Sequence, residues 1–152
     1  MQVLKIIEET MADGPGLRTS VYLAGCNHKC KGCHNPESWD FNQGEFFAPI
    51  DLAKKLLENK YTNITFSGGD PLYQIEDLVE CCKYIKENSD KNIWVYTGFS
   101  LEQIIDTPSF NKILPYIDTI VTDPYIEAMR DTTLKFKGSS NQRITNITDI
   151  KL

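Results

Sequence analysis

The sequence lacks both an excess of basic residues and any long apolar run. Lysine and arginine total 16 against 21 aspartate and glutamate residues, which gives a net charge of −5. A domain whose main partner is nucleic acid usually presents a basic face, so this balance argues against such a partner. No segment approaches the ~20 apolar residues that a membrane-spanning helix needs. We therefore expect a protein that binds neither nucleic acid nor a membrane.

The sequence also lacks the features of an exported protein and of a hydrolase triad. Residues 1–10 carry mixed charge and none of the apolar stretch that signal peptides contain. The cytoplasm keeps thiols reduced, so a cytoplasmic location is expected for a chain with five cysteines. No convincing Ser/His/Asp arrangement is present, and we predict no acid–base pair of catalytic side chains.

The chain is too short for a complete eightfold β/α barrel. It has 152 residues, whereas a full barrel needs at least about 200. One βα unit takes roughly 30 residues, so about four to five units fit. This length predicts a single domain spanning residues 1–152.

Three of the five cysteines, Cys26, Cys30 and Cys33, lie close together at C-x3-C-x2-C spacing. The glycine and asparagine residues around them, and the absence of an apolar period, indicate a loop. The preceding residues 18–25 form a short run with β-branched and aromatic side chains, which is typical of a strand. The sequence therefore predicts a cysteine loop that begins at the end of a strand.

The spacing alone leaves the bound group open. Thiolates are soft ligands that favour zinc, copper(I) or iron–sulfur clusters. A structural zinc site needs four ligands, and His28 or His34 would supply the fourth. A [4Fe–4S] cluster usually takes four cysteines, so three would leave one iron free to bind a substrate or cofactor.

Strands and helices are predicted to alternate along the rest of the chain. Pro49 suits the start of a helix, and Ser100 with Gln103 forms a capping box. In the segment 74–88 the apolar stripe places Cys82 in the core and Cys81 at its margin. This alternation predicts an α/β fold with parallel strands and right-handed crossovers. Strands are expected at residues 3–7, 18–25, 63–66, 92–96 and 118–122, and helices at about 49–60, at 74–88 and after Ser100.

Polar segments follow four of these predicted strands. They are the cysteine loop, residues 67–70, residues 96–98 and Asp123. In parallel α/β sheets, binding sites form at the carboxyl ends of the strands. We therefore expect these segments to converge on one face of the molecule.

Several motifs in these segments resemble a known family. The C-x3-C-x2-C loop at a strand end is similar to the cluster loop of radical S-adenosylmethionine (SAM) enzymes. The string D-G-P-G-x-R at 13–18, continued through residue 40, resembles the glycyl-radical-enzyme activases. Gly32 departs from the aromatic residue that many such loops have, but the anaerobic ribonucleotide reductase activases tolerate glycine there. S-G-G-D-P-L at 67–72 and G-S-S-N-Q at 138–142 also look like segments of these activases.

The resemblance implies a partial, open (β/α) barrel of the radical SAM type with a [4Fe–4S] cluster and SAM. It implies that Cys26, Cys30 and Cys33 bind three irons of the cluster. A motif such as Gly68, Gly69 and Asp70 would hold the methionyl ammonium of SAM, although tight βα turns also use paired glycines. Further candidates are Gly32, Cys33 and His34 along the adenine, Thr97 and Asp123 at the SAM pocket or a cation site, and Asp13, Arg18 and Arg143 as partner contacts.

The resemblance also implies a reaction and partners. A one-electron donor such as flavodoxin would reduce the cluster, and reductive cleavage of SAM would lead to a glycyl radical on the large subunit of anaerobic ribonucleotide reductase. Lys29 and Lys31 would suit an acidic donor, or they are simply solvated. Alternatives are a formate-lyase-type activase, an enzyme like 7-carboxy-7-deazaguanine synthase, and a zinc or iron–sulfur module that does not cleave SAM.

Overall fold

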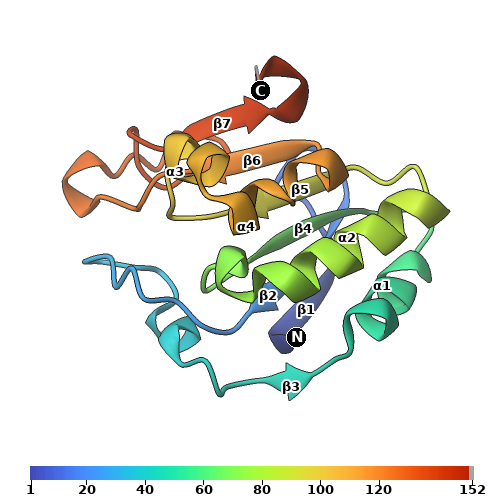
Figure 1. The fold of residues 1–152 in the computed structure, drawn as a ribbon. Coiled ribbons are helices and arrows are strands. Elements are labelled where there is room, and N and C mark those ends of the chain that lie inside the picture. The colour runs from blue at the N-terminus through green and yellow to red at the C-terminus, as the bar shows by residue number, and fades with distance from the viewer. Residues whose placement is uncertain (151–152) are drawn as a thin grey trace.

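A computed structural model describes residues 1–150 and contains one seven-stranded sheet (Figure 1). The strand order is β3-β1-β2-β4-β5-β6-β7. The strands are β1 (Gln2–Thr10), β2 (Arg18–Leu23), β3 (Glu45–Phe46), β4 (Asn63–Gly68), β5 (Ile93–Tyr96), β6 (Thr119–Thr122) and β7 (Arg143–Asn146). The helices are α1 (Pro49–Leu57), α2 (Ile75–Asn88), α3 (Leu101–Asp106) and α4 (Pro108–Asn111), and short 3-10 turns lie at Pro36–Trp39, Pro71–Gln74, Leu114–Tyr116, Glu127–Met129 and Ile147–Asp149.

The central strands β2, β4, β5 and β6 run parallel, as the alternation predicted. Helices lie in each of the three connections between them. The count of four to five βα units was too high, because β1 and β7 pair antiparallel with β2 and β6 at the flanks of the parallel core. The sheet is open, with β3 and β7 at its two edges.

The hydrophobic core lies between the sheet and helices α1 and α2, which cover one face (Figure 1). Alternate strand residues such as Val21, Phe66 and Val95 point into this core and are fully buried. Cys82 is buried there as predicted, and Cys81 is buried as well, not at the margin of the helix stripe. Among the described residues, no helix combines the length and apolar character needed to cross a membrane.

Candidate iron–sulfur site

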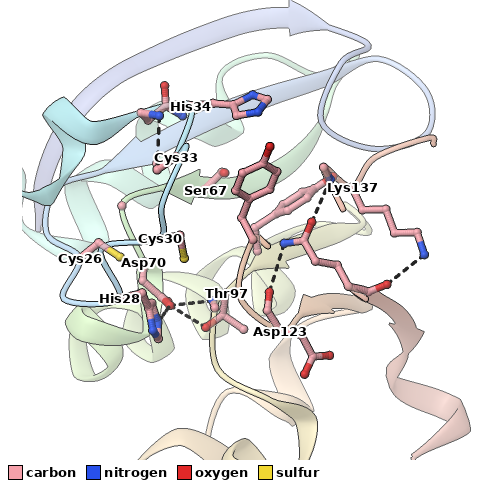
Figure 2. Close-up of a pocket in the computed structure, with 18 residues that line it drawn as sticks. Cys26, His28, Cys30, Cys33, His34, Ser67, Asp70, Thr97, Asp123 and Lys137 are labelled. Atoms are coloured by element: carbon pink, nitrogen blue, oxygen red, sulfur yellow. Dashed lines mark hydrogen bonds and ion pairs between the residues drawn. The ribbon is translucent and has the colours of Figure 1, made fainter. Parts of the chain in front are cut away.

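Four segments that are distant in the sequence line one cavity at the carboxyl ends of the parallel strands (Figure 2). The cysteine loop follows β2, residues 67–70 end β4, residues 96–98 end β5, and Asp123 follows β6. The predicted convergence is confirmed. The chain after β6 also lines the cavity, through Tyr125, Lys137, Gly138 and Gln142.

All three cysteines of the loop are free thiols and line this cavity. Cys26 is buried, whereas Cys30 and Cys33 are partly exposed, and the backbone N–H of Asn35 donates to Cys33 Sγ at 3.4 Å. Within residues 1–150, no three His, Cys, Asp or Glu side chains are grouped to hold a single metal ion. A [4Fe–4S] cluster does not need that grouping, because each thiolate binds a different iron.

Burial is the main influence on two of these thiols. It raises the pKa of Cys26, and backbone N–H groups of His28 and Lys29 act in the opposite direction. It likewise raises the pKa of Cys30, opposed most by the backbone at Tyr125. Burial favours the protonated thiols in the metal-free protein. A metal binds the thiolate, so metal binding to this loop releases the thiol protons. Three thiols on one loop that lines a cavity are a donor set that fits an iron–sulfur cluster.

Asp70 is almost completely buried, and both of its carboxylate oxygens accept hydrogen bonds from the protein. Oδ2 accepts from Thr97 Oγ1 and the Gly98 N–H, both at 2.9 Å, and lies 2.6 Å from His28 Nε2. Oδ1 accepts from the Leu72 N–H at 3.0 Å. An ammonium group would have to displace one of three partners to reach Oδ2. Thr97, expected at the SAM pocket, lines the cavity and is one of them.

The paired glycines after β4 lie against the backbone that follows β2. Gly68 has a φ of +102°, and a Cβ at this position would overlap the backbone of Leu23. A Cβ on Gly69 would overlap the carbonyl of Gly25. Hydrogen bonds join the same two segments: the Gly69 N–H donates to Leu23 O and the Asp70 N–H donates to Gly25 O, both at 2.8 Å. Close packing of two backbones therefore explains why both positions are glycine.

Gly32 lies outside the cavity lining, whereas its neighbours Cys33 and His34 are part of it. Gly32 has a φ of +76°, and a Cβ there would come within 2.9 Å of the Glu127 carboxyl carbon. The positive φ is a physical reason for glycine at the position where many similar loops have an aromatic residue, and the exposed Glu127 side chain adds a contact that could move away. The contact was not predictable, because Glu127 lies far along the chain, in the 3-10 turn Glu127–Met129.

The tail segment 138–143 fixes the loop that follows β6. Gln142 Oε1 accepts from the Gly138 and Ser139 N–H groups, and its Nε2 donates to Asp123 O at 3.1 Å. Arg143 pairs with both Asp123 and Glu102. The segment leads directly into β7 and brings Gln142 to the cavity beside Lys137, and neither was predicted as a cavity residue. The hydrogen bonds of Gln142 give the G-S-S-N-Q motif a structural role.

The three residues expected to contact a partner lie in different settings. Arg143 is exposed, and its guanidinium is paired with Asp123 and Glu102. Asp13 is partly buried and accepts from the Tyr22 hydroxyl. Arg18 is only 1% exposed, and its guanidinium donates to Thr65 Oγ1 and to the carbonyls of Pro15, Ile64 and Asn92, as well as the Asn92 side chain.

Arg18 is therefore a structural residue in this conformation, and the expectation of a partner contact needs correction. A partner could reach the guanidinium only after these hydrogen bonds break. Burial lowers its pKa from 12.5 to about 10, which still leaves it protonated at neutral pH. Trp94 lies against the guanidinium at 5.6 Å from the ring centre.

Replacing Arg18 with methionine is expected to destabilise the fold by about 3 kcal/mol, because several buried acceptors lose their donor. Urea unfolding of the metal-free protein measures the change. Arg143→Met is the matched control, since that arginine is exposed and its ion pairs are expected to contribute at most about 1 kcal/mol. Equal losses in the two variants would contradict the structural role of Arg18.

The open sheet carries free thiols at the end of one of its central strands, a donor set that suits an iron–sulfur protein. A model of the 4Fe–4S single cluster domain family matches residues 12–145. A protein from Haemophilus influenzae is 35% identical over 95% of this chain and 97% of its own length. A Vibrio cholerae protein is 34% identical over 91% and 93%, and an Escherichia coli K12 protein is 29% identical over 90% and 93%.

All three relatives bear the name anaerobic ribonucleoside-triphosphate reductase-activating protein. With most of both chains covered, the protein belongs to this family of activating proteins. The resemblance inferred from the cysteine loop and the tail is thus confirmed at the level of the family.

Proposed function

We propose that the chain reductively cleaves SAM at a [4Fe–4S] cluster and generates a glycyl radical on anaerobic ribonucleotide reductase. The observation that carries this proposal is the cavity shared by the three loop thiols and the ends of β4, β5 and β6. A purely structural metal site has no need of such a cavity. The family and its relatives' names support the reductase as the protein that is activated.

In this proposal Cys26, Cys30 and Cys33 bind three irons, and the fourth iron is left for SAM. Acceptors for the methionyl ammonium would come from the carbonyls of residues 67–69, which line the cavity beside the thiols. The backbone at Cys33 and His34 would lie along the adenine. Asp123 lines the same cavity, but Arg143 already neutralises its carboxylate.

When bound, the cluster and SAM supply a one-electron cleavage of a sulfonium C–S bond, which yields methionine and, with a hydrogen taken from a reductase glycine, 5′-deoxyadenosine. The protein's own part is orientation and shielding. The loop keeps Cys26 buried, and residues after β6 also line the cavity. No side chain is required to act as an acid or base.

The electron would come from a separate one-electron donor such as a flavodoxin. Lys29 and Lys31 are exposed on either side of Cys30, although the chain as a whole is acidic. A local positive rim beside the cluster ligand would favour an acidic donor. The large subunit of the reductase would approach the open side of the site. Reduced thiols at such a site fit the cytoplasm, where we expect the protein to work.

The protein, purified and reconstituted without oxygen, is expected to form 5′-deoxyadenosine from SAM when dithionite and the reductase are added. With the reductase present, electron paramagnetic resonance should detect a glycyl radical on the reductase chain. 5′-Deoxyadenosine is measured with and without the reductase, because a glycine of the reductase is the proposed hydrogen donor.

Other outcomes identify the alternatives. A radical on a formate-lyase-type enzyme but not on the reductase would indicate a different activase. Release of a modified small molecule would indicate chemistry like that of 7-carboxy-7-deazaguanine synthase. A bound zinc ion, or an intact reduced cluster that leaves SAM uncleaved even with the reductase present, would contradict the proposal.

A further inference from the structure

We propose that His28 and Asp70 form a clamp that positions the cysteine loop for cluster binding. His28 lies between Cys26 and Cys30 in the sequence, and its Nε2 is 2.6 Å from Asp70 Oδ2 (Figure 2). This inference assigns Asp70 a positioning role in place of direct contact with the SAM ammonium. It rests on the loop as the cluster site, and not on SAM cleavage.

The carboxylate of Asp70 joins three separate parts of the fold. It belongs to the end of β4, it accepts from Thr97 and Gly98 after β5, and it contacts His28 in the loop after β2. With the Leu72 N–H on its other oxygen, the carboxylate has four hydrogen-bonding partners. Three of these partners share Oδ2, so that oxygen has no acceptor site left, whereas Oδ1 accepts a single hydrogen bond.

The imidazole of His28 is also fixed by its packing. Its ring lies edge-on to Phe99 at 4.6 Å between ring centres and near Tyr73 at 5.7 Å. On the other side is Gly98, where a Cβ would come within 2.7 Å of the His28 ring. The ring therefore occupies a closely fitting place, and glycine at position 98 leaves the space for it.

This side chain connects the loop to the end of β4 and, through Asp70, to the turn after β5. Other contacts of the loop involve its backbone or a thiol: the backbone at Asn27 bonds Tyr73, and the Cys30 thiol bonds the backbone at Tyr125. Fixing His28 therefore restricts where the flanking thiols of Cys26 and Cys30 can lie. Residues that orient metal ligands in this way commonly change metal affinity by about tenfold or more when they are altered.

The other histidine of the loop provides a matched control. His34 packs edge-on against Tyr125 at 5.2 Å and also lines the cavity, but no hydrogen bond from its ring is found within residues 1–150. Both histidines therefore combine aromatic packing with proximity to the thiols. The hydrogen bond to a buried carboxylate distinguishes His28.

The test compares His28→Phe, His28→Gln, Asp70→Asn and His34→Phe in the full chain after anaerobic reconstitution. Phenylalanine keeps the ring packing and removes the hydrogen bond, whereas glutamine retains a donor.

Two quantities are measured. They are the rate of iron loss from the reconstituted protein to a chelator and the hydrogen exchange of the 26–34 peptide in the metal-free protein. For His28→Phe and Asp70→Asn, we expect about tenfold faster iron loss and faster exchange. His28→Gln is expected to recover most of the difference, and His34→Phe to keep the iron loss and the 26–34 exchange of the unaltered protein, the two readouts that do not depend on SAM.

SAM affinity of the cluster-loaded protein decides between the two roles of Asp70. If Asp70→Asn keeps normal iron retention and loop exchange but loses SAM binding, Asp70 holds the ammonium and the clamp is wrong. Equal rates of iron loss and of loop exchange in His28→Gln and His28→Phe would also overturn the clamp. If one variant fails to fold, the remaining variants still test it. Cys30→Ala separates the two proposals: an intact cluster in that variant would reject the ligand assignment, whereas cluster loss there with normal His28→Phe would reject only the clamp.

Discussion

The Cys30→Ala variant is expected to retain no [4Fe–4S] cluster after reconstitution and to form no detectable 5′-deoxyadenosine. Cys30 supplies one of only three thiols in the loop, and it lines the cavity with its side chain partly exposed. Two thiolates would leave two irons without a protein ligand. Iron and sulfide per chain, the visible absorption of the cluster, and 5′-deoxyadenosine are the quantities to measure.

Cys81→Ala is the matched control, because it also removes one thiol. Cys81 is completely buried in α2, and burial raises its pKa to about 12, so it remains a protonated core residue at neutral pH. We expect normal cluster content and a modest loss of stability from the smaller side chain. Equal cluster loss in the two variants would reject the assignment of ligands to the loop.

The parallel core of the fold was predictable because its signals are local. Short apolar runs with turns behind them identified β4, β5 and β6, and Ser100 with Gln103 marked the start of α3, where the structure has a full capping box. The edge strand β3 was missed, since it has two exposed residues and no periodicity. The antiparallel pairing of β1 and β7 depends on contacts between residues distant in sequence, which no local pattern encodes.

The site was predictable in its location but less so in its contacts. Parallel topology places the loop, the glycine turn and Asp123 at one end of the sheet, whatever their individual roles. The burial of Arg18 was not foreseen, because an arginine at the start of a strand gives no sign of five neighbouring acceptors. The His28–Asp70 pair joins residues 42 apart in sequence, so spacing could not reveal it.

The motif around Gly68 also has two possible explanations, and the contacts of the residue help to choose between them. A pair of glycines after a strand is typical of close approach by a ligand, and also of tight packing between backbones. Here the backbone of Leu23 occupies the space beside Gly68. The requirement for glycine therefore has a sufficient cause within the fold, and a SAM-binding role for the carbonyls of this turn has to be tested separately.

Gly68→Ala is expected to destabilise the protein by about 3 kcal/mol or more, from backbone strain together with overlap against β2. For a chain of this size, the melting temperature of the metal-free protein should fall by roughly 10 °C. Gly16→Ala is the control: Gly16 also has a positive φ, at +73°, but nothing lies within 4 Å of a Cβ there. Strain alone predicts about 1–2 kcal/mol in that variant.

The comparison of these two glycine variants separates packing from ligand binding, because it is made before any cofactor is added. A much larger loss for Gly68→Ala than for Gly16→Ala assigns the difference to contact with the Leu23 backbone. If instead Gly68→Ala melts like Gly16→Ala and, once reconstituted, binds SAM poorly, the glycine is there to admit the ligand. The turn after β4 would then have to separate from β2 in the SAM-bound protein.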